Sequence, residues 1–478
     1  MAAVLVAVLS VVMLERQRDG VSSERMTLAS TPVTVWRSNE IEGGPLVVVA
    51  HGYAGSRQMM QPISIALARA GFVVAAFDFL GHGRNTDPMT GDVASLEGAT
   101  ARLVEQTIAV AQAARDLPGV TGPISLVGHS MATDVVIRTA ERIDDVAAVV
   151  AISMYSDAVT PNSPERLLIV SGAREGRLRD VALGRLHQID TEAIEGETVT
   201  NGAVVRRAVA APSVGHVGVL YSQFTLTEVR DWIAATAGSK SVGPLPHIAP
   251  WLLTLLISLV VLMWPLSNAL GPPLVRPAQL GRRIILILVA PIAPALLAAI
   301  VILPGMGGLF AFGALTVFTG TWGAVQLALL WRVGVRPARI RPRAIALMLV
   351  WGLGIFALAL NHYGAAFVPT GRRLGIMLML MLGTVPFCVA DALVVARSGW
   401  IASLGQRILP LLTLLCAMLV STELGIAFTV LPVMVLFWMV YGLAGGWVQK
   451  RSDPTSVGFV LGVILAWSVA ASTPLVAS

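Results

Sequence analysis

The sequence predicts a mostly parallel β-sheet with helices on both faces, followed by an all-α bundle that spans a membrane. Only 13% of the 478 residues are charged, about half the usual share of a soluble domain, and the mean hydropathy is +0.75. Residues 15–240 carry acidic and basic side chains throughout, whereas residues 251–478 hold long apolar runs separated by short connectors rich in Arg, Gly or Pro. We therefore expect one soluble unit and one membrane-embedded unit.

The chain begins with an apolar segment at residues 2–14, which is short for a membrane span. No basic residue precedes this segment and no small-residue cleavage site follows it, so we favour an N-terminal anchor over a cleaved signal peptide. The predicted organisation is an anchor or uncleaved signal segment at 1–25, an α/β domain at 26–238, a linker at 239–250 and a bundle of about eight helices at 251–478.

Within the soluble unit, short β-rich apolar runs alternate with helical patterns. We expect strands at 46–50, 72–77, 124–127, 146–152, 167–171 and 204–209, and helices at 58–70, 97–116, 131–142 and 224–237. Such alternation predicts a mostly parallel sheet with helices on both faces. Ligands of these sheets bind at the carboxyl ends of the strands, which is where the motifs described next fall.

A serine follows the third of these strands in a context suited to a nucleophile. The pentapeptide Gly128–Ala132 (GHSMA) ends a strand and opens a helix. A nucleophile elbow needs small residues two positions before and two positions after the serine, because the tight turn brings backbone segments together. Ala132 stands where glycine is usual, but it is small enough for the turn. We therefore expect Ser130 to be the nucleophile.

A Gly-rich turn follows the first central strand at His51–Ser56 (HGYAGS). A turn in this place can direct backbone N–H groups at an oxyanion, and we assign this role to the N–H groups of Tyr53 and Met131. The histidines within the motifs, His51, His82 and His129, are expected to be structural.

His216 lies just past the last predicted strand and can act as the general base, because histidine titrates near neutral pH. The acid that orients it should follow the preceding strand, which favours Glu175 and leaves Asp180 and Asp157 in reserve. The chain order Ser130, Glu175, His216 is the order of α/β-hydrolases.

The stretch from His51 to Asn85, including FDFLGHGRN at 77–85, together with Gly128–Met131, resembles the α/β-hydrolase superfamily, and within it the monoglyceride-lipase-like and serine-aminopeptidase-like branch. The resemblance covers the predicted α/β domain of about 210 residues. It implies an α/β-hydrolase fold, with Ser130 as nucleophile, His216 as base and the N–H groups of Tyr53 and Met131 as oxyanion donors.

The sequence departs from the pattern of this superfamily in four places. Ala132 replaces glycine, Asn85 stands where serine is common, and Glu175 stands where aspartate is usual. The cap that precedes the acid strand is reduced to about Met154–Pro164. The reduced cap implies an open site, or one covered by the membrane or the bundle.

The C-terminal region contains eight apolar runs of about the length that a membrane span needs. We expect spans at 251–267, 284–303, 309–331, 344–361, 374–396, 408–422, 427–446 and 456–475. Asp391 falls in the fifth run. An intramembrane carboxylate is a functional hypothesis by default, but Arg397 is only six residues away, which makes an interfacial position an equal alternative.

Basic residues concentrate in alternate connectors. The first, third, fifth and seventh connectors hold twelve of them, and the other side holds only Arg372 and Arg373. The twelve are Arg276, Arg282, Arg283, Arg332, Arg336, Arg339, Arg341, Arg343, Arg397, Arg407, Lys450 and Arg451. Lys and Arg accumulate in short cytoplasmic loops. We therefore expect a multi-pass protein of the plasma or inner membrane, with the α/β domain on the extracytoplasmic side.

These features predict hydrolysis of an ester, with an amide as second choice, in a lipidic or amphiphilic substrate through an acyl-enzyme. We expect no cofactor and no metal, since no cluster has metal-ligand spacing. The lipid bilayer is an expected partner, and nucleic acid is not, because much of the basic excess lies in the connectors. Two alternatives stay open: a transporter or flippase with an accessory hydrolase-like domain, and an acyltransferase.

Overall fold

The computed structural model describes the whole chain except residues 93–94, 237–242, 276, 302–308, 310 and 478. The chain forms two compact units. We call Leu9–Leu253 with Tyr363–Ala366 the sheet unit, and Met1–Val8 with Thr254–His362 and Phe367–Ser478 the helical unit. The domain boundaries expected from the sequence stay a prediction, and the expected linker at 239–250 lies partly outside the described residues.

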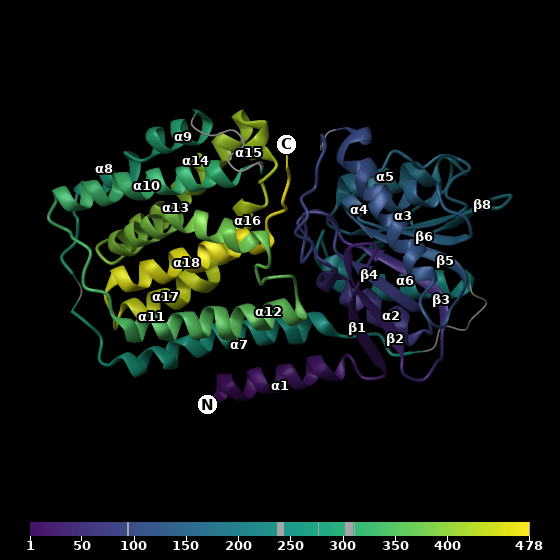
Figure 1. Cartoon of the computed structure of the whole chain (residues 1–478), viewed down its shortest axis with the longest axis horizontal. Coiled ribbons are helices and arrows are strands. Elements are labelled where there is room, and N and C mark those ends of the chain that lie inside the picture. Colours follow the sequence, from purple (N-terminus) through teal and green to yellow (C-terminus); the bar gives the residue numbers. More distant parts are fainter. Residues whose placement is uncertain (93–94, 237–242, 276, 302–308, 310, 478) are drawn as a thin grey trace. The chain divides into compact units, whose positions relative to one another are not determined.

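A nine-stranded sheet in the order β1-β2-β4-β3-β5-β6-β7-β9-β8 forms the centre of the sheet unit among the described residues (Figure 1). The strands are β1 (Val21–Leu28), β2 (Thr31–Ser38), β3 (Gly44–Ala50), β4 (Val73–Phe77), β5 (Val120–His129), β6 (Val146–Ile152), β7 (Arg166–Gly172), β8 (Thr198–Asn201) and β9 (Val204–Ala211). All neighbours from β4 to β9 pair in parallel, whereas β1, β2 and β8 pair antiparallel. The predicted mostly parallel sheet is therefore confirmed.

The central strands are continuous apolar runs because both of their faces are covered. Every residue of β4 is buried, as are the last five residues of β3 and of β6. The edge strand β1 instead reads VSSERMTL and is mostly exposed. Its lack of an apolar run explains why the sequence did not predict it.

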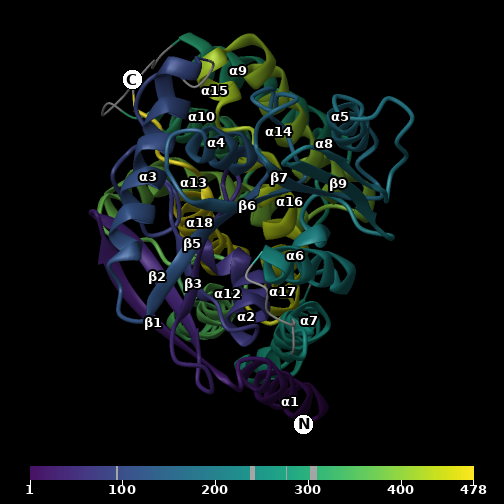
Figure 2. The ribbon, with the colours of Figure 1, turned by 90° about the vertical axis from the view of Figure 1, so that its right-hand side faces the viewer.

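Helices cover both faces of the sheet. They are α2 (Gln61–Arg69), α3 (Ala101–Arg115), α4 (Met131–Ala140), α5 (Gly176–Leu186) and α6 (Gln223–Thr236), with the shorter turns η1 (Arg57–Met60), η2 (Leu96–Thr100) and η3 (Gly218–Tyr221), and α1 (Ala2–Arg16) precedes the sheet. α2 and α6 pack together on one face, and α3 and α4 pack together on the other (Figure 2). The sequence did not predict α5, because only Ala182 and Leu186 of its residues are buried.

Eight helical stretches among the described residues, nearly all of them within the helical unit, are long and apolar enough to cross a membrane. Four of them are single helices: α10 (Phe312–Arg332), α13 (Arg372–Val395), α14 (Trp400–Val420) and α18 (Pro454–Ser472). The other four consist of consecutive elements: Ile248–Leu270 of α7 (Ile248–Ser267) and η4 (Asn268–Leu270), Arg283–Val301 of α8 (Arg283–Val289) and α9 (Ile292–Val301), Pro342–Tyr363 of α11 (Pro342–Leu349), η6 (Val350–Phe356) and α12 (Ala357–Tyr363), and Val430–Gln449 of α16 (Val430–Phe437), η7 (Trp438–Gly442) and α17 (Leu443–Gln449). The short α15 (Thr422–Gly425) is a single turn. Each of the eight predicted runs thus overlaps one of these stretches, although residues 302–303 and 310 of the second and third runs lie outside the described residues.

The predicted start of the sixth span was wrong. We expected it at 408, with Arg407 in the preceding connector, but α14 begins at Trp400 and includes Arg407. The Arg407 guanidinium lies 3.4 Å from the buried carboxylate of Asp391 and 4.3 Å from the ring centre of Trp438. A counter-charge and an aromatic face thus accommodate the charge of this partly buried guanidinium in an otherwise apolar helix. Asp391 is 1% exposed, inside α13.

Close backbone contact joins α13 to α18, which lie side by side (Figure 1). A Cβ atom on Gly458 would lie 2.5 Å from the Cα atom of Val389, and one on Gly462 would lie 2.5 Å from the Cα atom of Val385. The two glycines are four residues apart on α18, the small-residue spacing that lets membrane helices approach closely.

Candidate active site

Three parallel strands bring the predicted site residues to one edge of the sheet. Ser130 lies between β5 and α4, Glu175 lies three residues beyond β7, and His216 lies five residues beyond β9. Since β5 and β9 are separated in the sheet only by β6 and β7, the carboxyl ends of these strands place all three residues close together.

The side chains of these three residues form a hydrogen-bonded chain. His216 Nε2 lies 2.9 Å from Ser130 Oγ, and His216 Nδ1 lies 2.6 Å from Glu175 Oε1. With the imidazole proton on Nδ1, the ring donates to Glu175 and accepts from the hydroxyl of Ser130. The His216 side chain is 47% exposed and that of Glu175 is 7% exposed. Solute can therefore reach the imidazole, whereas the carboxylate is largely shielded from water.

Hydrogen bonds hold the Glu175 side chain in its charged form. Its Oε2 atom accepts from the backbone N–H of Gly172 at 2.6 Å and from the hydroxyl of Ser153 at 2.7 Å. Burial alone would raise the pKa of this carboxyl. The hydrogen bonds from His216, Gly172 and Ser153 outweigh burial, and the pKa of Glu175 lies below its ordinary value.

Sequence reasoning missed Ser153, although it directly follows β6 at the same edge. Ser153 is fully buried, and its φ of 52° places its backbone in the left-handed region. The only available signal was its place directly after a predicted strand. Of the two reserve acids, Asp157 pairs with Arg138 at 2.8 Å and Asp180 lies within α5, so the structure brings only Glu175 to the histidine.

The turn around Ser130 is strained in the way that a nucleophile elbow requires. Ser130 has φ 54° and ψ −120°, and its N–H donates to the carbonyl of Ile152 at 2.9 Å. A Cβ atom on Gly128 would lie 2.6 Å from the carbonyl oxygen of Ala132. Glycine is therefore needed before the serine, whereas Ala132 is accommodated, fully buried, after it.

The loop after β3 passes close to the serine. A Cβ atom on Gly52 would lie 2.9 Å from the Cβ atom of Ser130 and 3.0 Å from Nδ1 of His129. Tyr53 follows in this loop, and Met131 is the first residue of α4, where backbone N–H groups lack partners within the helix. The two predicted oxyanion donors thus come from segments that meet at Ser130.

Asp78 joins this loop to the loop that follows β4. The fully buried carboxylate accepts from the backbone N–H of Arg57 at 2.8 Å and from the backbone N–H of Arg84 at 2.9 Å, and it also pairs with the Arg57 guanidinium. Arg57 Nε in turn donates to the hydroxyl of Thr34 at 2.8 Å. Asp78 therefore fixes the base of the loop that carries Tyr53, a role that the sequence did not reveal.

Two buried histidines beside the site bind backbone carbonyls. His51 Nδ1 lies 2.8 Å from the carbonyl oxygen of Gly52, and His129 Nε2 lies 2.9 Å from that of His216. Burial lowers the pKa of His51 and of His129 to about 4, so both are neutral near neutral pH. Among the residues that the structure describes, no group of three or more His, Cys, Asp or Glu side chains could hold a metal ion.

Residues 45–189 match the family model described as the alpha/beta hydrolase fold. That range contains Ser130 and Glu175 and ends before His216. The sheet unit thus has the α/β-hydrolase fold that the sequence predicted. A comparison with curated proteins found no match.

Solved structures similar to this chain cover only part of it. TT1662 from Thermus thermophilus is 17% identical, covering 46% of this chain and 99% of that one, with a TM-score of 0.34. Est1E from Butyrivibrio proteoclasticus with bound ferulic acid is 15% identical, covering 45% and 100%, with a TM-score of 0.36. A bacterial membrane phospholipase A is 12% identical, covering 48% and 92%, with a TM-score of 0.34.

Proposed function

We propose that the sheet unit is a serine hydrolase that cleaves an ester bond, with an amide as second choice, through an acyl-enzyme. The observation that carries this proposal is the hydrogen-bonded chain from Ser130 through His216 to Glu175. A serine hydroxyl is a weak nucleophile by itself and needs an adjacent base that a third group orients. The three side chains have the contacts that this chemistry requires.

In the proposed reaction Ser130 Oγ attacks the ester carbonyl carbon while its proton passes to His216 Nε2. Glu175 stabilises the resulting imidazolium, and the N–H groups of Tyr53 and Met131 bind the oxyanion. His216 then gives its proton to the leaving alcohol, which departs and leaves an acyl group on Ser130. Water, deprotonated by His216, attacks this acyl group; the bond to Ser130 Oγ then breaks, His216 returns the proton to Ser130 Oγ, and the carboxylic acid leaves.

The surface beside the triad favours an amphiphilic substrate. Tyr155 is 75% exposed and Val217 is 51% exposed, two residues after Ser153 and one residue after His216 respectively. The segment 153–165 between β6 and β7 contains no helix, so the expected reduction of the cap agrees with the structure. Exposed Tyr155 and Val217 side chains close in the chain to the site residues suit an ester that carries an apolar group.

The helical unit is proposed to span a membrane and to hold the sheet unit on the extracytoplasmic side. Arg407 belongs to α14 and not to a connector. Between the eight helical stretches, the first, third, fifth and seventh connectors nevertheless contain Lys or Arg, and the second, fourth and sixth contain neither. Arg373, counted earlier on the other side, is buried in α13 and donates to the carbonyls of Ala470 and Thr473, each at 2.7 Å. Arg373 thus binds backbone carbonyls at the C-terminal end of α18. The concentration of basic residues in alternate connectors supports the proposed orientation.

A matched pair of histidine variants tests the proposed reaction. His216→Gln should lower kcat for a short acyl ester by at least about a thousandfold, because the serine loses its base. His187→Gln is the control, since that ring binds the carbonyl of Ala193 at 3.0 Å, away from the triad. Equal activity of the two variants would contradict the proposal. Analysis of the products with and without a second alcohol separates hydrolysis from acyl transfer.

Labelling of intact cells tests the proposed orientation. A membrane-impermeant probe for serine hydrolases should label the full-length protein in intact cells as strongly as in lysed cells. Labelling only after lysis would place the sheet unit in the cytoplasm.

A further inference from the structure

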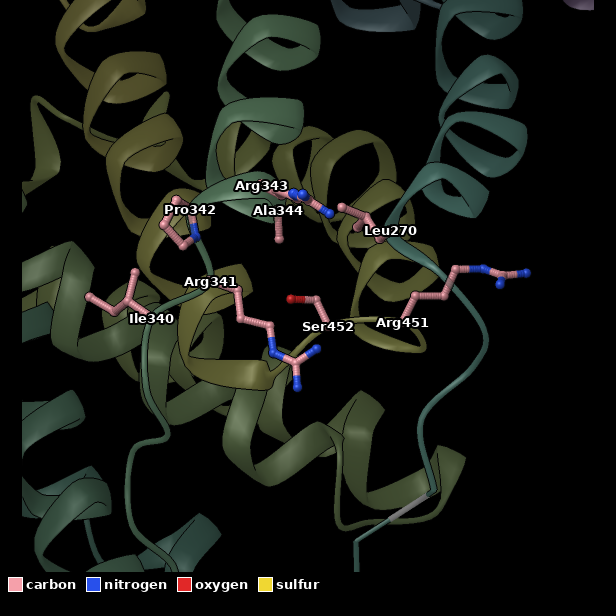
Figure 3. A pocket seen from close by; sticks show the side chains of 8 residues that line it. All are labelled: Leu270, Ile340, Arg341, Pro342, Arg343, Ala344, Arg451 and Ser452. Carbon is pink, nitrogen blue, oxygen red and sulfur yellow. The ribbon is translucent and has the colours of Figure 1, made fainter.

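The helical unit contains a cavity of about 470 Å³ at the ends of four of its helical stretches. The cavity lies where η4 ends, where α11 begins and where the chain turns between α17 and α18 (Figure 3). Its lining residues are Leu270, Ile340, Arg341, Pro342, Arg343, Ala344, Arg451 and Ser452. This volume is within the usual range of sites for small molecules.

The lining carries an excess of positive charge. It includes three guanidinium groups. One of them, that of Arg341, pairs with a carboxylate: its Nε atom lies 3.9 Å from Asp453 Oδ2. Asp453 already accepts from the backbone N–H and the hydroxyl of Ser456, at 2.8 and 2.7 Å. One engaged carboxylate cannot neutralise three arginines, so the cavity attracts an anion.

The arginines differ in how they are held. Arg451 Nη1 donates to the carbonyl of Gly271 at 2.6 Å, which ties the wall of the cavity together, and its guanidinium points away from the middle of the cavity in Figure 3. Arg341 and Arg343 lie on opposite sides of the cavity in that view. Within the described part of the chain, the Arg343 guanidinium has no ion pair or hydrogen bond. Arg341 and Arg343 are therefore the groups suited to hold a ligand.

Two further groups of the lining can donate hydrogen bonds to an anion. The hydroxyl of Ser452, a residue that is 2% exposed, points toward the middle of the cavity (Figure 3) and lies 3.5 Å from Asp453 Oδ2, a contact that an anion would replace. The start of α11 at Pro342 has no side-chain cap, and α11 continues through η6 and α12 as one helical stretch of 22 residues. The uncapped N-terminus of a long helix adds partial positive charge at the same place.

Half of the lining is apolar: Leu270, Ile340, Pro342 and Ala344. A free phosphate ion would gain nothing from these side chains, whereas the glycerol and first acyl carbons of a phospholipid would contact them. The cavity also lies among basic connectors, on the side where membranes expose anionic lipids to the cytoplasm. We propose that this cavity binds the phosphate group of an anionic phospholipid, held by Arg341, Arg343 and Ser452.

Lipid binding to the full-length protein in mild detergent tests this proposal. Native mass spectrometry would compare phosphatidylglycerol with phosphatidylcholine of the same acyl chains. We expect tighter binding of phosphatidylglycerol, and a loss of about fivefold in its affinity for each of R341Q and R343Q, or about 25-fold for both together. R343Q alone should fold normally, because Arg343 has no ion pair or hydrogen bond within the described part of the chain.

Arg339→Gln is the matched control, because Arg339 belongs to the same connector as Arg341 but does not line the cavity. It should change affinity by less than about twofold. A loss equal to that of R343Q, or equal binding of the two lipids, would overturn the proposal. Displacement of the lipid by inorganic phosphate as readily as by glycerophosphoglycerol would assign the cavity to free phosphate instead.

The proposal rests on the membrane-spanning role of the helical unit and not on the esterase activity. Ser130→Ala should therefore bind phosphatidylglycerol as tightly as the wild type does. Normal lipid binding together with absent esterase activity would overturn the proposed reaction and leave the lipid site in place.

Discussion

The hydroxyl of Ser153 offers a sharp perturbation, because it touches the proposed acid and not the nucleophile or the base. It donates to Glu175 Oε2 at 2.7 Å, and the backbone N–H of Gly172 donates to the same atom at 2.6 Å. Ser153→Ala would remove one of the donors to a buried carboxylate without changing the others. A hydrogen bond to a charged group contributes about 1.5–3 kcal/mol to stability.

Most of that loss should appear as a lower free energy of unfolding, because Glu175 is charged both before and during the reaction. The part that reaches catalysis is the loss of orientation of Glu175 and, through it, of His216. We expect kcat for a soluble short acyl ester to fall about tenfold, which corresponds to about 1.4 kcal/mol of transition-state stabilisation. KM should stay within about twofold of the wild type, since Ser153 acts through Glu175.

Ser171→Ala is the matched control for this variant. Ser171 is a fully buried serine in the neighbouring strand β7, and within the described part of the chain its hydroxyl oxygen has no hydrogen-bond partner. Its replacement should leave kcat unchanged. The reasoning fails if Ser153→Ala keeps the wild-type kcat, or if both variants lose activity equally.

Three further predictions concern the loop, the histidines and the bundle. Gly52→Ala should lower kcat about tenfold or more, because its methyl group would lie 2.9 Å from the Cβ atom of Ser130; wild-type kinetics would contradict this. His51 and His129, whose pKa values are about 4 in the folded protein, take up protons more readily in the unfolded chain. The protein should therefore lose stability as the pH falls from about 6.5 toward 4. Between pH 7 and pH 5 each histidine should reduce the free energy of unfolding by about 2 kcal/mol, and a midpoint of thermal unfolding that stays constant over this range would refute the claim. Asp391→Ala should destabilise the helical unit by about 3–5 kcal/mol, because it leaves the Arg407 guanidinium without its counter-charge. Replacing both residues by leucine should restore most of that loss, and a double variant as unstable as the single one would contradict the pairing.

The sequence allowed prediction of the central sheet, and of three residues that meet at its edge, for a physical reason. Strands buried on both faces must be continuous apolar runs, and they are recognisable without any partner. Ser130 directly follows the buried end of β5 and His216 lies five residues beyond β9, so the parallel topology brings them together. The choice of Glu175 over Asp157 depended on loop geometry, which the structure supplies.

Features that depend on distant partners could not be predicted in the same way. Nothing in the local sequence distinguishes Ser153 from other serines that follow strands, because its role lies in a contact with a residue 22 positions away. Arg407 looked like a connector residue, since the carboxylate that accommodates its charge in an apolar helix lies on α13, 16 residues earlier. The half-exposed edge strand β1 lacks a continuous apolar run and gives no clear period.

Covalent labelling shows whether Ser130 is a nucleophile activated by His216. The full-length protein would be treated with a fluorophosphonate probe, digested, and the modified residue located by mass spectrometry. We expect the label to lie on Ser130, Ser130→Ala to take up none, and His216→Gln to take up far less than the wild type. A label on a different serine, or equal labelling of the Ser130→Ala variant, would contradict this role of Ser130.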